Sequence, residues 1–285
     1  MAHKIDLLVA VKQPDGERFR TNLSAYENFR VRVAHSITDA LAMIDDREYH
    51  VDVLVCDNNL EADVFSVVAD LRNRYPRLLI VLVDEEADFA MPGQADDIST
   101  EPFRNDDLVR RISRLITDRR QETLRSDSLP AVRQFAKLLR TATGAIGKQQ
   151  VAVQACKEMN YDYVAYYHRE SNDPLRLALK AHTGPKAIEA IAPREATIED
   201  LMGWVQQNGQ SRIAAPEDRP NHPLVTRGRL GAVACVPVMF NNVTSGVMTA
   251  CRERPGTITQ ENVLMLELIC SQLGASLSRE TGGLS

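Results

Sequence analysis

The stretch VDVLVCDNNL, residues 51–60, decides how the first half of the chain is interpreted. A mostly apolar run leads into Asp57, and the polar pair Asn58–Asn59 follows it. The carboxyl end of a buried strand is where an α/β protein places a ligand-binding group or a phosphoacceptor. The stretch therefore predicts a central parallel strand that ends at a candidate functional carboxylate.

The segments around this stretch alternate between strand-like and helix-like patterns. Helical spacing follows most strands, but the segment EEADFAMPGQ (85–94) is a poor helix because Pro92 and Gly93 interrupt it. The expected strands are KIDLLVAV (4–11), FRVRVAH (29–35), VDVLVC (51–56), LLIVLV (78–83) and ADDIST (95–100). Strands that alternate with helices favour right-handed crossovers. Residues 1–119 are therefore expected to form a doubly wound, five-stranded parallel sheet of the α/β class.

The pattern changes in the middle of the chain. The stretch TDRRQETLRSDSLP (117–130) is charged and lacks an apolar stripe, so we place a helical linker at residues 120–129. Residues 130–285 begin and end with helical segments, and strand-like runs lie between them, with Asn241–Asn242 as a hairpin turn. This half is expected to be an α+β domain with an antiparallel sheet.

Composition narrows the class of protein. The 285 residues suffice for two domains, and a net charge of −5 argues against a nucleic-acid-binding surface. No apolar run approaches the roughly 20 residues that would cross a bilayer. The five cysteines lie far apart, mostly in apolar stretches, which is typical of reduced and buried thiols. We therefore expect a cytoplasmic protein without nucleic-acid or membrane partners.

The position of Asp57 and the segment QADDISTEPF (94–103) carry a first resemblance. Residues 3–118 resemble the receiver domain of two-component response regulators, and Asp57 falls at the position of that family's phosphoacceptor. The resemblance implies two acidic residues after the first strand, a serine or threonine after the fourth, and a lysine before the proline that follows the fifth. The acidic residues hold the divalent cation that neutralises the phosphoryl oxygens.

The chain departs from the receiver pattern around Asp57. Val11 and Lys12 stand at the positions of the acidic pair. Val83, followed by Asp84, stands at the position of the serine or threonine, and Glu101 stands at the position of the lysine. A lone carboxylate offers too few ligands for tight magnesium binding, and the Lys12 ammonium could pair with Asp57 instead. We therefore interpret residues 1–119 as a pseudo-receiver with an inactive Asp57. Two alternatives stay open: an unconventional acceptor, and an alignment of the first loop that brings in Asp15 or Glu17.

Three stretches of the second half carry another resemblance. They are GWVQQNGQSRIAAPEDRPNHPLV (203–225), GAVACVPVMFNNVTSGVMTACRE (231–253) and TITQENVLMLELICSQLGASLSR (257–279). With Pro237 and Gly246, they resemble a GAF domain, a sensing module of signalling proteins. The resemblance implies an antiparallel sheet with helices on one side and a ligand pocket under loops on the other.

Candidate ligand-binding residues on the loop side are His182, Trp204, His222, Arg227 and Arg229. Each also has an ordinary interpretation, such as packing for Trp204, a loop hydrogen bond for His222 and solvation for the arginines. No cysteine neighbours a histidine, as covalent tetrapyrrole attachment would require, and the signature of cyclic-nucleotide binding is missing. The loop 183–229 has no cysteine for methionine sulfoxide reduction. We expect no cofactor, metal or catalytic residue, and leave open whether the domain binds a small molecule or only dimerises.

These observations predict a non-catalytic cytoplasmic signalling protein that acts through contacts with another, unidentified signalling protein. Apolar positions on the first and last helices of residues 130–285 also predict a parallel homodimer, unless they pack within their own domain. These positions are Phe135, Leu138, Leu139, Leu266, Ile269, Leu273 and Leu277. Two other functions stay open. One is a phosphorylatable response regulator with Asp57 as acceptor and the GAF domain as effector, and the other is a redox sensor or a haem sensor that uses His182.

Overall fold

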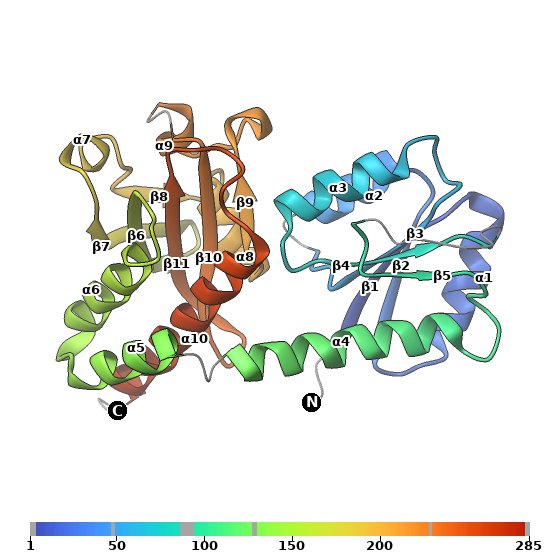
Figure 1. The fold of residues 1–285 in the computed structure, drawn as a ribbon, viewed down its shortest axis with the longest axis horizontal. Coiled ribbons are helices and arrows are strands. Elements are labelled where there is room, and N and C mark those ends of the chain that lie inside the picture. The colour runs from blue at the N-terminus through green and yellow to red at the C-terminus, as the bar shows by residue number, and fades with distance from the viewer. Residues whose placement is uncertain (1–3, 47–48, 86–93, 127–129, 228–229, 283–285) are drawn as a thin grey trace. The chain divides into compact units, whose positions relative to one another are not determined.

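The computed structural model describes residues 4–46, 49–85, 94–126, 130–227 and 230–282. The chain divides into two compact units, Met1–Glu122 and Thr123–Ser285, which we call the N-terminal unit and the C-terminal unit. Each unit is built on a sheet flanked by helices (Figure 1). Within the described residues, no helix combines the length and the apolar character needed to span a membrane.

The sheet of the N-terminal unit has five strands in the order β2-β1-β3-β4-β5. Every pair of neighbouring strands is parallel. The strands are β1 (Ile5–Ala10), β2 (Phe29–Ala34), β3 (Val53–Asp57), β4 (Leu79–Val83) and β5 (Asp97–Ser99). The expected α/β fold with a five-stranded parallel sheet is confirmed, and it is compatible with a receiver-like fold.

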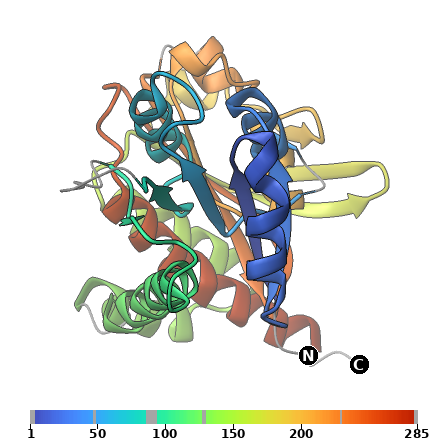
Figure 2. The ribbon, with the colours of Figure 1, turned by 90° about the vertical axis from the view of Figure 1, so that its right-hand side faces the viewer.

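Helices cover both faces of this sheet (Figures 1 and 2). They are α1 (Gln13–Ser24), α2 (Ile37–Asp45), α3 (Val64–Arg74) and α4 (Asp107–Ser126). On one face, Val9, Val55 and Val81 share an apolar core with Phe19 of α1 and Leu108 of α4. Because strand side chains alternate, the intervening residues face α2 and α3 on the other side.

Local signals explain where these helices begin. The Ser36 hydroxyl accepts a hydrogen bond from the Asp39 amide at 3.0 Å and so caps the start of α2. Helix α1 begins at Gln13, and Pro14 lies in its first turn, where proline is tolerated. Most of the interrupted segment 85–94, and residues 127–129 of the expected linker, lie outside the described residues.

The C-terminal unit contains a six-stranded antiparallel sheet in the order β8-β7-β6-β11-β10-β9. The strands are β6 (Tyr163–Asn172), β7 (Leu175–Thr183), β8 (Glu195–Thr197), β9 (Arg212–Ala214), β10 (Ala232–Phe240) and β11 (Val243–Arg252). Asn241 and Asn242 form the expected hairpin turn, and both have positive φ angles, 49° and 61°. The expected α+β architecture is confirmed, with β8 as an additional edge strand.

Three helices pack on one face of this sheet: α5 (Pro130–Thr141), α6 (Gly144–Lys157) and α10 (Gln260–Gly282). The segments between β7 and β10 hold α7 (Lys186–Glu189), α8 (Leu201–Asn208), the 3₁₀ turn η1 (Pro216–Asp218) and α9 (Pro223–Thr226). Gly209 is the C-cap of α8, and its φ of 68° is the left-handed conformation that glycine adopts readily at this position.

Most of the apolar residues that the sequence suggested for a dimer interface lie in the core of the C-terminal unit. Six of them are buried in that core: Phe135, Leu139, Leu266, Ile269, Leu273 and Leu277. Leu138 remains 46% exposed. The amphipathic pattern of α5 and α10 is therefore explained mainly by packing onto the unit's own sheet.

Candidate functional site

The carboxyl ends of the central strands meet at one edge of the parallel sheet. The register pairs Asp57 of β3 with Val83 of β4, and Val83 with Ser99 of β5. Lys12 follows the end of β1, whose Ala10 pairs with Cys56. The sheet thus brings Asp57, the suggested phosphoacceptor position, to the same edge as Lys12 and Val83, which stand where a receiver has an acidic residue and a hydroxyl residue.

Asp57 is partly buried, and its carboxylate accepts a hydrogen bond from a neighbouring residue. Its Oδ1 atom accepts a hydrogen bond from the Asn59 amide at 2.8 Å, an Asx turn that shapes the start of the β3–α3 loop. The next residue, Asn58, donates from Nδ2 to Oδ2 of Asp84 at 3.0 Å. The Asn58 amide also donates to the Val83 carbonyl at 2.8 Å, so the ends of β3 and β4 are held together by side-chain and backbone hydrogen bonds.

The charged residues suggested as neighbours of Asp57 form no recorded ion pair with it within the described residues. Lys12 is exposed at the N-cap position of α1, and no ion pair joins it to Asp57 within the described residues. Glu101 is exposed and forms an ion pair with Arg104 at 2.7 Å. Glu17, on α1, lies 3.7 Å from Arg20. The pairing of the Lys12 ammonium with the Asp57 carboxylate, which the sequence suggested, is thus not made in this conformation.

The residues at this edge do not fit the magnesium site that a receiver-like fold implies. Magnesium requires near-octahedral oxygen ligands, of which one or two are protein carboxylates and several are waters. Here an aliphatic residue, Val11, and a cation, Lys12, follow β1, and one oxygen of Asp57 already accepts an amide hydrogen bond. In the part of the chain that the structure describes, no group of three or more His, Cys, Asp or Glu side chains is placed to hold a metal ion.

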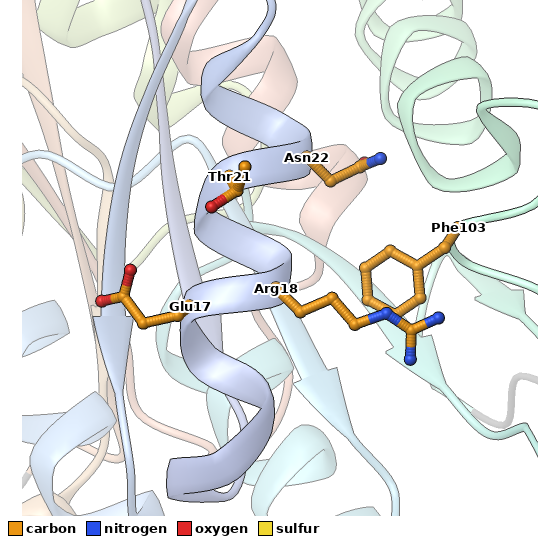
Figure 3. A pocket seen from close by; sticks show the side chains of 5 residues that line it. All are labelled: Glu17, Arg18, Thr21, Asn22 and Phe103. Carbon is orange, nitrogen blue, oxygen red and sulfur yellow. The ribbon is translucent and has the colours of Figure 1, made fainter.

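The described residues of the N-terminal unit line hollows at two places. One is open along the β3–α3 loop, directly after Asp57, and is lined by Asn58, Asn59, Leu60, Glu61, Ala62, Val64 and Phe65. The Phe65 ring is 47% exposed there. The other lies between α1 and the β5–α4 loop, where the Arg18 guanidinium stacks 3.8 Å from the Phe103 ring centre (Figure 3). Both hollows combine an aromatic ring with polar side chains, which suits contact with protein segments.

In the C-terminal unit, His222 is the most unusual of the suggested ligand-binding residues. It is fully buried, and neither ring nitrogen has a hydrogen-bond partner among the described residues. Burial lowers its pKa to about 4, so the imidazole is neutral near pH 7. His222 caps α9, and its backbone carbonyl accepts from the Val225 amide at 3.0 Å. The expected loop hydrogen bond is made by the backbone and not by the ring.

The other suggested residues have ordinary surroundings. Trp204 is buried on α8, and the Arg212 guanidinium lies 5.1 Å from its ring centre. His182 is partly buried, its Nδ1 atom lies 3.4 Å from a Glu189 carboxylate oxygen, and its ring stacks on that of Tyr163. Arg227 is exposed directly after α9. Arg229 lies outside the described residues.

All five cysteines are unpaired and buried. Burial raises the pKa of every one of these thiols, and that of Cys156 rises to about 12. A thiol that stays protonated is a poor nucleophile and a poor metal ligand. The sequence-based interpretation of structural, reduced cysteines agrees with this environment.

The GAF domain family model matches residues 149–278. This segment is a GAF domain. Among solved structures, the GAF domain of an Acinetobacter phosphoenolpyruvate-protein phosphotransferase is 17% identical, covers 53% of this chain and 93% of its own, and has a TM-score of 0.47. The free methionine-R-sulfoxide reductase of Neisseria meningitidis is 16% identical, with 53% and 87% coverage and a TM-score of 0.46. No curated protein matches the chain.

Sequence reasoning missed two features of these sites. The Asn58–Asp84 hydrogen bond joins residues that are 26 positions apart, and only the register of β3 and β4 brings them together. The Tyr163 phenol is a buried group of the GAF domain without a hydrogen-bond partner among the described residues. Its position in the run YDYVAYYHRE (161–170) gave no sign of this, because the run contains four tyrosines and residue type does not distinguish them.

Proposed function

We propose that this chain is a non-catalytic signal-transduction protein in which a pseudo-receiver and a GAF domain act through contacts with other proteins. The observation that carries the proposal is the environment of Asp57. Its Oδ1 atom is held by the Asn59 amide, while an exposed lysine, Lys12, stands where a receiver has an acidic residue. Phosphoryl transfer to a carboxylate needs a cation to neutralise the crowded oxygens, and these residues do not supply its ligands.

The contact role of the N-terminal unit is supported by its surface. The β3–α3 loop presents Leu60 and the half-exposed Phe65 beside the polar side chains of Asn58 and Asn59. An aromatic anchor with a polar rim is typical of protein interfaces. We expect that Phe65→Ala weakens capture of the signalling partner, and that Asp57→Asn leaves it unchanged.

We also propose a homodimer formed through the helices of the GAF domain. Six of the seven suggested positions are buried. Among the described residues of α5, α6 and α10, the large apolar side chains that are exposed are Leu138 (46%) at the end of α5 and Ile146 (77%) at the start of α6. Light scattering of the wild type and of a Leu138→Asp, Ile146→Asp double variant tests this. A monomeric wild-type protein would contradict the proposed homodimer.

The cytoplasm is the proposed location, because five buried, unpaired cysteines suit a reducing compartment. The same cysteines argue against the redox-sensor alternative, since their protonated thiols are unreactive. The Nδ1 atom of His182 lies 3.4 Å from a Glu189 carboxylate oxygen without forming a hydrogen bond to it, and no observation favours His182 as a haem ligand.

Treatment of the full chain with acetyl phosphate or beryllofluoride in the presence of Mg²⁺ tests the pseudo-receiver. Intact-mass spectrometry and ¹⁹F NMR detect the two adducts, and Asp57→Asn is the matched control. We expect no signal that depends on Asp57. Saturable labelling that disappears in Asp57→Asn would instead establish the alternative, a phosphorylatable response regulator.

A further inference from the structure

Phe65 is an aromatic side chain that the core of the N-terminal unit does not use. Helix α3 buries Val64, Val68 and Leu71, which form a stripe at helical spacing against the sheet. Phe65 lies outside this stripe and is 47% exposed in the hollow along the β3–α3 loop. Leu60, in the same hollow, is only partly buried. The hollow therefore presents apolar surface that packing within the unit does not require.

The loop that forms this hollow is held by hydrogen bonds to helix starts. The Asp63 carboxylate accepts from the Ser66 amide at 3.2 Å and so caps α3. The Glu61 carboxylate accepts from the Ile37 amide at 3.1 Å, at the start of α2. A loop that is already fixed in this way loses little conformational entropy when a partner binds to it.

Glu61 and Asp63 also place negative charge at the hollow. Both residues are exposed, and within the described part of the chain neither forms an ion pair. The loop and the segments that contact it through Ile37 and Val83 add no compensating cation. These segments contain acidic residues but no lysine or arginine, and they are residues 36–46, 51–71 and 78–85. The hollow thus combines an exposed aromatic ring with an acidic surrounding.

We propose that this hollow binds a basic segment of a partner protein, with one apolar side chain against Phe65 and lysine or arginine side chains facing Glu61 and Asp63. The inference rests on the proposed contact role of the N-terminal unit, and it specifies the chemistry of the segment that is recognised. A buried aromatic anchor supplies much of the binding energy at such a contact. The charges around it select the partner, because a segment of like charge is repelled.

Selection of a phage-displayed library of random dodecapeptides on the full chain tests the proposed preference. Enriched peptides are then synthesised with a fluorescent label, and fluorescence anisotropy measures their affinity for the protein. We expect the enriched peptides to carry a net positive charge and at least one large apolar residue. Raising the salt concentration from about 0.1 M to about 1 M shortens the screening length from about 10 Å to about 3 Å, so the affinity should fall.

Matched variants separate the apolar contribution from the charged one. Phe65→Ala should weaken binding about tenfold or more, as the loss of an aromatic anchor implies. The double variant Glu61→Gln, Asp63→Asn removes two charges but keeps an acceptor oxygen at both helix starts, and it should weaken binding about 2- to 30-fold and reduce the salt dependence. Glu17→Gln is the control, because this exposed acid lies on α1, on the opposite face of the sheet.

Several results would overturn the inference. These are no enrichment over a support without protein, enriched peptides without an excess of positive charge, or binding that neither Phe65→Ala nor the double variant weakens. Enriched peptides that match a basic stretch of this chain, such as residues 119–125, would place a second copy in the hollow instead of a different protein.

The outcomes also distinguish this inference from the proposed function. Peptides without positive charge that still need Phe65 would overturn the inference but support the contact role of the N-terminal unit. Reactivity of Asp57 toward acetyl phosphate would overturn the pseudo-receiver but not this surface. The proposals therefore fail separately.

Discussion

Acidification should destabilise the C-terminal unit through His222. In the unfolded chain this imidazole titrates near 6.5, whereas burial lowers its pKa in the folded protein to about 4. Between these values the unfolded state binds a proton that the folded state does not, so stability falls as the pH falls. The loss begins below about pH 6.5 and is complete near pH 4. One pKa unit corresponds to about 1.4 kcal/mol, so the full loss is about 3 kcal/mol, of which about 2 kcal/mol falls between pH 7 and pH 5.

Urea unfolding followed by the fluorescence of Trp204 measures this effect, because the only tryptophan lies on α8 of the C-terminal unit. The variant His222→Leu should lose about 2 kcal/mol less than the wild type between pH 7 and pH 5. His168, whose pKa burial also lowers, is present in both proteins and cancels in the comparison. An equal pH dependence in the two proteins would refute the reasoning, since it would mean that the ring is hydrated or already has a partner.

Three further substitutions test the packing. Tyr161→Phe removes a buried hydroxyl that has no partner among the described residues, and should raise the free energy of unfolding by about 1 kcal/mol in urea titrations followed by Trp204 fluorescence. Ser36→Ala removes the cap of α2 and should lower the stability of the N-terminal unit by about 1 kcal/mol, measured by circular dichroism. Gly203→Ala places a Cβ 2.1 Å from the Thr197 carbonyl oxygen and should lower the free energy of unfolding by about 1–3 kcal/mol in the same fluorescence assay. The control is Gly147→Ala, whose new Cβ has its nearest atom at 4.0 Å, and it should be neutral or stabilising.

The parallel sheet could be predicted because its signal is local. Each central strand is a continuous apolar run, such as residues 78–83, and both of its faces are covered by helices. The edge strand β8 could not be predicted, since its three residues, Glu195–Thr197, pair with Arg176–Ala178 only after the intervening segment has folded over the sheet. The apolar stripes of α5 and α10 were also ambiguous. Periodicity shows that a helix face is buried but does not reveal whether a sheet or a second chain covers it.

The candidate sites, too, could be predicted from the sequence only in part. The identity of Lys12 and Glu101 could be read from the sequence, and this suggested the loss of receiver chemistry. The direction of these side chains depends on helix starts and local ion pairs, such as that of Glu101 with Arg104, which residue type alone does not specify. The sequence NHP around His222 is compatible with a solvated loop and with a buried turn, and only the packing of the layer over the sheet decides between them.

The candidate sites of the two units differ in how their polar groups are satisfied. At the sheet edge of the N-terminal unit, Asp57 accepts a hydrogen bond from Asn59, and Asp84 accepts one from Asn58. Hydrogen bonds within the protein therefore already engage carboxylate oxygens to which a ligand would bind. A ligand there would have to replace existing hydrogen bonds and would gain little. In the GAF domain, the ring nitrogens of His222 and the Tyr163 hydroxyl have no hydrogen-bond partner among the residues that the structure describes, so a bond to them would replace none of those seen. This contrast supports the proposal that the N-terminal unit acts through contact with a protein and not by binding a small ligand at the Asp57 edge.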